Sequence, residues 1–141
     1  MAESQLPVNH LYKVTLETDG IPIMIPGAPQ GTRMLIVVKG GSFEGPKLSG
    51  TVIAPSGDWV TQRVDGSIKL DVRMTLKTND NAMIFVSYNG IGNVVDGQFK
   101  AHCAPVFETG DERYAWLNNI QAVGIGGLDG TNVVYDIYEL L

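Results

Sequence analysis

The 141-residue chain contains few of the residues that covalent or metal-based chemistry requires. Its single cysteine, Cys103, excludes an internal disulfide. Its two histidines are His10 and His102. Because neighbouring residues of a strand point to opposite faces, His102 and Cys103 are not expected to share a metal ion. A P-loop, a complete dinucleotide fingerprint and a nucleophile elbow are also missing. We therefore expect no metal and no cofactor.

Charge and long hydrophobic runs are also scarce. Charged residues make up only 18% of the chain, and the formal net charge is −5 with no basic cluster. This composition argues against nucleic acid or a membrane as a partner. No stretch reaches the roughly 20 apolar residues of a membrane-spanning helix. The polar segment 1–10 lacks the pattern of a signal peptide, which together with the single cysteine predicts a cytoplasmic protein.

Alternation of apolar and polar residues is the main signal that is present. It is clearest over 67–77, and shorter runs cover 11–18, 33–39, 82–88 and 132–140. The chain has 17 glycines and five Asp-Gly or Asn-Gly pairs. Those that begin at Asp65, Asn89, Asp96 and Asp129 are typical of tight hairpin turns, and Asp19-Gly20 is expected to close the first strand. A short helix is expected between 94 and 102. The pattern predicts one all-β domain over 1–141, a sandwich or a closed barrel of about eight to ten strands, with 1–9 as a flexible N-terminus.

Four segments carry a family resemblance: GGSFEGPKLSG (40–50), GDWVTQRVDGSIKLDVRMTLKT (57–78), FETGDERYAWLN (107–118) and VVYDIYEL (133–140). They are similar to the domain-of-unknown-function family numbered 3237, over nearly the whole chain from His10. The resemblance implies a closed antiparallel barrel of the lipocalin or calycin type that often forms a homodimer, and it implies no particular reaction. Where the family tends to carry an aromatic-Arg-Thr pattern, this chain has Ala101-His102-Cys103, so that a titratable imidazole replaces an arginine.

The candidate catalytic residues are acids, bases and hydrogen-bond donors on the expected strands. Asp71 and Arg73 share one face of the 67–77 strand, and given the family barrel we expect this face to be interior, with a solvent-exposed ion pair as the alternative. His102 titrates near neutral pH. Tyr88 is a candidate donor to a developing oxyanion. Glu44 is a candidate acid or base, or alternatively a cap of its turn.

A second group of residues is expected to bind the substrate. Trp59, Tyr114 and Trp116 are candidates for an apolar wall, with ordinary core packing as the alternative. Arg113 is a pocket cation or an interface residue, and Asp58 is a polar contact or a turn cap. The apolar, proline-containing segment 20–31 is expected to be a loop that covers a pocket mouth, a partner subunit or its own core.

These features favour a cofactor-free enzyme that isomerises, cyclises or eliminates by general acid/base catalysis. Its substrate would be a small, largely apolar, oxygenated metabolite, hydrophobic or aromatic, of the kind found in secondary metabolism. One alternative is a carrier or sensor that binds such a molecule without turnover. Another is an interaction module whose barrel interior is filled. Analogy of fold does not distinguish these functions.

Overall fold

The computed structural model describes residues 5–141, which form eleven strands and one 3₁₀ helix. Their bounds are β1 (Val8–Glu17), β2 (Ile23–Ala28), β3 (Gly31–Val38), β4 (Gly40–Glu44), β5 (Ser49–Gln62), β6 (Ile68–Thr78), β7 (Met83–Val95), β8 (Gln98–Cys103), β9 (Val106–Glu108), η1 (Glu112–Asn119), β10 (Ala122–Asp129) and β11 (Asn132–Leu140). Val8 and Asn9 already belong to β1, so the expected flexible segment 1–9 is too long. Its residues 1–4 lie outside the described residues.

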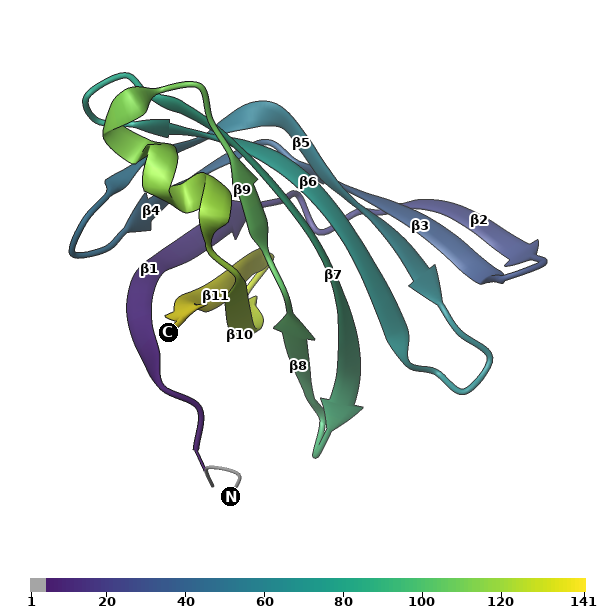
Figure 1. The fold of residues 1–141 in the computed structure, drawn as a ribbon. Helices are drawn as coiled ribbons and strands as arrows, with labels where there is room; N and C mark the ends of the chain where they lie inside the picture. The colour runs from purple at the N-terminus through teal and green to yellow at the C-terminus, as the bar shows by residue number, and fades with distance from the viewer. Residues whose placement is uncertain (1–4) are drawn as a thin grey trace.

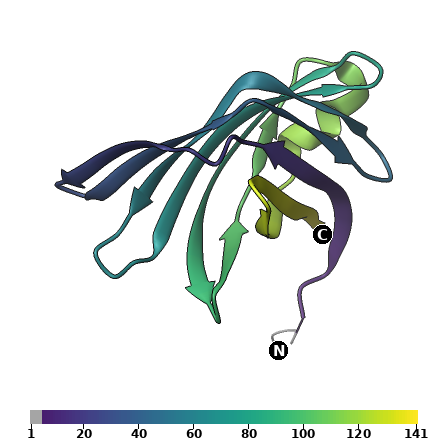
Figure 2. The ribbon, with the colours of Figure 1, turned by 180° about the vertical axis from the view of Figure 1, so that it is seen from behind.

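The strands form a closed antiparallel barrel, as predicted. The order β5-β4-β1-β11-β10-β8-β7-β6 returns to β5 through a β5–β6 pairing, so that eight strands make a complete ring. Closure leaves these strands without a free edge in the ring. The β2–β3 hairpin extends the sheet by pairing with residues 56–62, the C-terminal half of β5. Figures 1 and 2 show this hairpin projecting away from the barrel.

Three local predictions were wrong. Segment 20–31 contains strand β2, at the edge of the sheet, where Pro26 falls in the irregular stretch between Ile25 and Ala28 and removes no hydrogen bond from a central ladder. Asn89-Gly90 lies inside β7, because Gly90 faces Cys103 of β8 so closely that a Cβ there would lie 2.3 Å from the His102 carbonyl oxygen. The expected helix at 94–102 is a hairpin through Asp96-Gly97, and the short helix is η1.

The hydrophobic core fills the end of the barrel near η1 and continues as far as the layer of Tyr88 and Tyr135. Tyr12 packs edge-on against Phe43 and Phe107, with ring centroids 5.6 and 6.2 Å apart. Helix η1 covers this end, as Figure 1 shows, and inserts Tyr114 and Leu117 into the core. Because this half of the interior is occupied by side chains, any site inside the barrel has to lie toward the opposite end.

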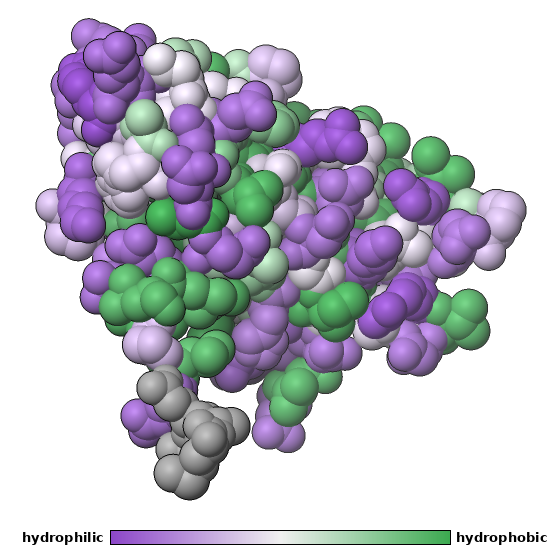
Figure 3. Space-filling view, viewed as in Figure 1, coloured by the Kyte–Doolittle hydropathy of each residue, from purple (hydrophilic) through white to green (hydrophobic). Residues whose placement is uncertain are grey.

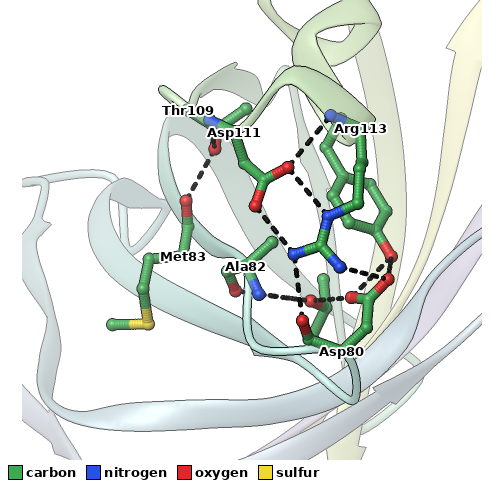
Figure 4. A network of polar contacts seen from close by, with 8 residues as sticks. Asp80, Ala82, Met83, Thr109, Asp111 and Arg113 are labelled. Atoms are coloured by element: carbon green, nitrogen blue, oxygen red, sulfur yellow. Dashed lines mark hydrogen bonds and ion pairs between the residues drawn. The ribbon is translucent and has the colours of Figure 1, made fainter.

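A polar network fastens η1 to the β6–β7 turn (Figure 4). The Asp80 carboxylate accepts hydrogen bonds from the Tyr114 hydroxyl at 2.9 Å and from Thr78, and it lies 3.2 Å from the Arg113 guanidinium. Asp111 caps the start of η1 and forms a second ion pair with Arg113 at 2.8 Å. The sequence RYAWLN therefore closes the barrel, which is a structural role.

Glycines of the segment GGSFEGPKLSG allow close strand contacts at the same end. A Cβ on Gly45 would lie 1.9 Å from the Leu11 carbonyl oxygen, and one on Gly50 would lie 2.0 Å from that of Lys77. Any larger residue would force the backbones apart. This segment is thus required for the geometry of the barrel wall.

The outer surface mixes polar and apolar side chains, as the face in Figure 3 shows. Exposed apolar residues include Trp59, Phe85 and, in β2, Ile23, Met24 and Ile25. Across residues 5–141, no helix combines the length and the apolar character that crossing a membrane would require.

Candidate functional site

The apolar face of β6 points into the barrel. Leu70, Val72, Met74 and Leu76 are buried, so the alternating residues Asp71 and Arg73 lie on the outer face. The expectation that Asp71 and Arg73 face the interior was therefore wrong. The physical reason is that inverting the strand would expose four large apolar side chains and bury a guanidinium without a partner.

The outer wall holds several of the other predicted residues. The Arg73 guanidinium lies 5.9 Å from the centre of the Trp59 ring, which is 41% exposed. Arg73 and Asp71 line a surface hollow of about 570 Å³ together with Phe85, Asn89 and Tyr88, the last of which is otherwise buried. His102 is exposed and lines a neighbouring hollow of about 420 Å³, while Cys103 points to the interior, as the alternation predicted. Asp71, Arg73 and His102 do not meet at a point inside the barrel.

The remaining predicted residues lie at the closed end. Tyr114 and Arg113 belong to the network around Asp80, and Trp116 is partly buried, with Lys47 Nζ lying 5.0 Å from the centre of its ring. Glu44 is exposed at the end of β4. For Tyr114 and Trp116 the structure supports the alternative of ordinary packing. No group of three or more His, Cys, Asp or Glu side chains between residues 5 and 141 is arranged to hold a metal ion.

Asp58 and Tyr88 are the predicted site residues that the fold brings together. Both pair with the same residue of β6, Val72, and all three side chains consequently share the interior face of the barrel. Tyr135 of β11 joins them, with its ring 5.8 Å from that of Tyr88 in an edge-on arrangement. Cys103 of β8 is buried in the same layer of the interior. We call Asp58, Tyr88, Cys103 and Tyr135 the acidic layer.

Asp58 occupies an interruption in the β5–β6 ladder. The strands pair at Asp58–Val72 and again at Thr61–Lys69, and the main-chain N–H of Asp71 lies in the interval between these pairs. This N–H donates to Asp58 Oδ1 at 2.9 Å. The Asp58 carboxyl thus replaces a backbone acceptor, which holds one of its oxygens against the wall of the barrel.

Burial controls the ionisation of the acidic layer. It raises the pKa of Asp58 to about 6. The hydrogen bond from the Asp71 N–H lowers this pKa, and the negative charge of Asp71 raises it further. Burial likewise raises the pKa of the Cys103 thiol to about 12, with a further contribution from Asp58. The pKa values of Tyr88 and Tyr135 are also raised by burial and then by neighbouring acidic groups. Asp58 is consequently the member of the layer that exchanges a proton near neutral pH.

The Tyr88 hydroxyl is buried and forms no hydrogen bond of ordinary geometry within residues 5–141, although it interacts with the Tyr135 hydroxyl closely enough to oppose the rise in the pKa of that group. A buried donor without a partner costs roughly 1–3 kcal/mol. Such a cost in a native protein calls for a functional explanation, for instance a hydrogen bond to a bound molecule. The hydroxyl is therefore available to a ligand that reaches the acidic layer.

The acidic layer lies toward the end of the barrel opposite η1. Asp58 is partly exposed, and partly buried apolar residues surround it toward this end: Met34, Ile36, Ile68, Phe99 and Val133. Interior glycines make room for aromatic rings here. A Cβ on Gly126 would lie 2.3 Å from the Tyr135 ring, and one on Gly92 would lie 2.5 Å from Phe99. We call this end, with its apolar residues, the mouth.

Sequence reasoning missed Tyr135 and treated Asp58 as a polar contact or a turn cap, whereas the structure places the Asp58 carboxyl on the interior face in the layer of Tyr88. A signal for both exists. Asp58 lies two residues before the buried Val60 on β5, and Tyr135 lies two residues before the buried Ile137 on β11, so each faces the same side of its strand as a core residue. Gly124 and Gly126 on the neighbouring strand β10 are the small residues that leave space opposite such side chains.

The fold and this site define a small antiparallel barrel that is packed at one end and carries a titratable carboxyl with two tyrosines at the other. The chain belongs to the family described as "Protein of unknown function (DUF3237)", which matches residues 6–140.

Comparisons with known proteins agree with this membership. A UPF0311 protein of Rhodopseudomonas palustris is 29% identical over 125 residues, covering 79% of this chain and 82% of its own. The hydroalkoxylation enzyme phnH of Penicillium herquei is 33% identical over 92 residues, covering 65% of this chain and 56% of its own. A solved structure from Acinetobacter baumannii, described as a beta-barrel like protein, superposes with a TM-score of 0.91 at 25% identity, covering 99% of both chains.

Proposed function

We propose that this chain is an enzyme that transfers protons by general acid/base catalysis, without a cofactor, on a small, largely apolar, oxygenated molecule bound at the mouth. One observation carries the proposal: the Asp58 carboxyl, with its pKa raised to about 6, lies in the same interior layer as a buried Tyr88 hydroxyl that forms no hydrogen bond of ordinary geometry within residues 5–141. A general acid or base works best when its pKa lies near the operating pH.

Each part of the site has a distinct task in this proposal. Asp58 donates or accepts the proton, and the hydrogen bond from the Asp71 N–H fixes its orientation. The Tyr88 hydroxyl donates a hydrogen bond to an oxygen of the substrate and so orients the substrate beside Asp58. The apolar residues of the mouth bind the hydrocarbon part of the substrate and exclude water.

The relative from Penicillium herquei suggests a specific reaction within this class, the addition of an O–H group across a carbon–carbon double bond. Here the protonated Asp58 would donate its proton to one alkene carbon. The substrate hydroxyl oxygen would then form a bond to the other carbon, and the hydroxyl proton would pass to the Asp58 carboxylate. Atoms and electrons balance without an oxidant, reductant or co-reactant, and Asp58 ends protonated as it began.

The test uses 2-prenylphenol, in which protonation of the side-chain double bond gives a tertiary cation that the phenol oxygen captures as 2,2-dimethylchroman. We expect the wild-type protein to form this product and, in D₂O, to place one deuterium on the protonated carbon. Asp58→Asn should lower turnover by about 100-fold or more. Tyr88→Phe should lower it by about tenfold or more, because the substrate oxygen loses its orienting hydrogen bond. Glu44→Gln, at the closed end, is the matched carboxyl control and should retain turnover.

Full turnover in Asp58→Asn would contradict the proposal. Binding of 2-prenylphenol without any turnover in the wild-type protein would instead favour the carrier or sensor alternative, which needs the same mouth but no proton donor.

A further inference from the structure

The acidic layer determines which electrical charge a ligand can carry. Its titratable groups come from four strands, with Asp58 on β5, Tyr88 on β7, Cys103 on β8 and Tyr135 on β11. Every one of them becomes negative when it loses its proton. Tyr12 of β1 and Asp71 of β6 act on the same groups and are acids as well.

Basic side chains of the adjacent strands point away from this layer. Lys69 and Arg73 of β6 alternate with the buried residues Leu70 and Val72, which places them on the outer face. Arg33 of β3 donates to Thr61 Oγ1 at 2.9 Å, on the outer face of β5. The residues that flank Asp58 on the interior face, Ile36 and Val72, are apolar. The layer therefore contains acids in an apolar surrounding, and no described cation neutralises them.

We infer that the mouth takes up its ligand in the uncharged form and discriminates against anions, so that the substrate class is a neutral phenol, enol or alcohol and not a carboxylate or a phosphate ester. This inference rests on the proposed site at Asp58. A ligand anion beside ionised Asp58 would place two negative charges in a desolvated region, where like charges interact strongly. A neutral hydroxyl instead donates to the Asp58 carboxylate or accepts from Tyr88.

The discrimination has a pH dependence with a definite sign. Above the pKa of Asp58 the carboxylate is ionised and repels an anion. As the pH falls through this pKa the charge disappears, and an anion that remains ionised should bind more tightly. The other groups of the layer keep their protons throughout this range, because burial raises their pKa values. A neutral ligand should respond little.

The experiment measures binding of 2-naphthol and 2-naphthoate, which share one ring system and differ in charge, by calorimetry at about pH 5.5 and about pH 7.5. We expect 2-naphthol to bind with similar affinity at both. We expect 2-naphthoate to bind at least about tenfold more weakly than 2-naphthol at the higher pH. At the lower pH its affinity should approach that of 2-naphthol. In Asp58→Asn the difference between the two ligands should largely vanish at both pH values. Asp129→Asn, a carboxyl at the end of β10 on the same side of the barrel, should keep it.

Equal binding of the two ligands to the wild-type protein at the higher pH would overturn the inference. So would discrimination that survives Asp58→Asn, or failure of 2-naphthol to bind. The proposed function is judged separately, by turnover of 2-prenylphenol. Equal binding combined with loss of turnover in Asp58→Asn would leave the catalytic role standing and remove the charge selectivity. Selective binding without turnover would leave the charge selectivity standing and remove the catalytic role.

Discussion

At the scale of single residues, Asp58 is a carboxyl whose ionised form is disfavoured by its surroundings. Desolvation is the largest cause, and it exceeds the stabilising hydrogen bond from the Asp71 N–H. The protein thus keeps the Asp58 carboxylate in an unfavourable environment at neutral pH. It also buries the Tyr88 hydroxyl without a hydrogen bond of ordinary geometry in residues 5–141. Costs of this kind concentrate at functional sites, which is why these two residues carry the proposal.

The pH dependence of stability tests the state of Asp58. Its pKa is about 6 in the folded protein, above the value near 4 of an unfolded chain, so its contribution to stability is fully present below about pH 4 and is lost as the pH rises through 6. Asp58→Asn should therefore be more stable than the wild-type protein at about pH 7.5, by up to about 2 kcal/mol, and should lose this advantage at about pH 4. Urea unfolding at the two pH values measures the difference, and an advantage independent of pH would contradict it.

Gly45 tests the structural explanation of the family segment 40–50. In Gly45→Ala the new Cβ would meet the Leu11 carbonyl oxygen, a backbone atom that cannot move without displacing β1. We expect a loss of about 3 kcal/mol or more in the free energy of unfolding, or no folded protein. Gly110→Ala is the control, because nothing lies within 4 Å of a Cβ there. Thermal unfolding of both variants measures the difference. Equal unfolding midpoints for Gly45→Ala and Gly110→Ala would show that β1 and β4 can separate at little cost.

At the scale of elements, β6 shows what an alternating pattern predicts and what it leaves open. The pattern correctly predicted the strand to within one residue at each end. It did not correctly identify the interior face, because we expected a polar barrel interior and assigned Asp71 and Arg73 to it. The apolar face is inside because burying four large side chains is worth several kcal/mol, roughly 1.5–3 for each.

Helix η1 is held by polar contacts as well as by its two buried residues. Asp80→Asn removes the charge that pairs with Arg113 and weakens the acceptor of the Tyr114 hydroxyl. We expect the midpoint of thermal unfolding to fall by a few degrees and amide hydrogen exchange to accelerate in η1 more than in β10 or β11. Asp96→Asn, at a left-handed turn position that asparagine also tolerates, should change neither. Exchange that accelerates uniformly would contradict a local role for Asp80.

At the scale of the whole molecule, the homodimer implied by the family resemblance stays a prediction. The β2 edge strand offers a surface for it, since Ile23 and Ile25 are 56% and 59% exposed. We expect the protein to sediment as a dimer, and Ile25→Lys to shift it toward the monomer, because an interface would have to bury the new charge. Val64→Lys, at a fully exposed position between β5 and β6, is the control. A wild-type monomer across a concentration series would contradict the prediction.

The sequence by itself determined the all-β class, the positions of five of the eleven strands and the absence of the familiar motifs for nucleotide, metal and covalent chemistry. These follow from local rules, namely the period of two along a strand and the turn preference of Asp-Gly pairs such as Asp96-Gly97 and Asp129-Gly130. The family segments were also visible in the sequence, although not the fact that they close the barrel.

Only the tertiary structure decided which residues form the site. Asp58, Tyr88 and Tyr135 come from three strands that are distant along the chain, and they meet because β5, β7 and β11 belong to one closed ring. The same closure separates Asp71 from Asp58, which lie on opposite faces of the wall although the N–H of one donates to the carboxyl of the other. Register and closure are long-range properties, and a side chain's environment, and with it its pKa, depends on them.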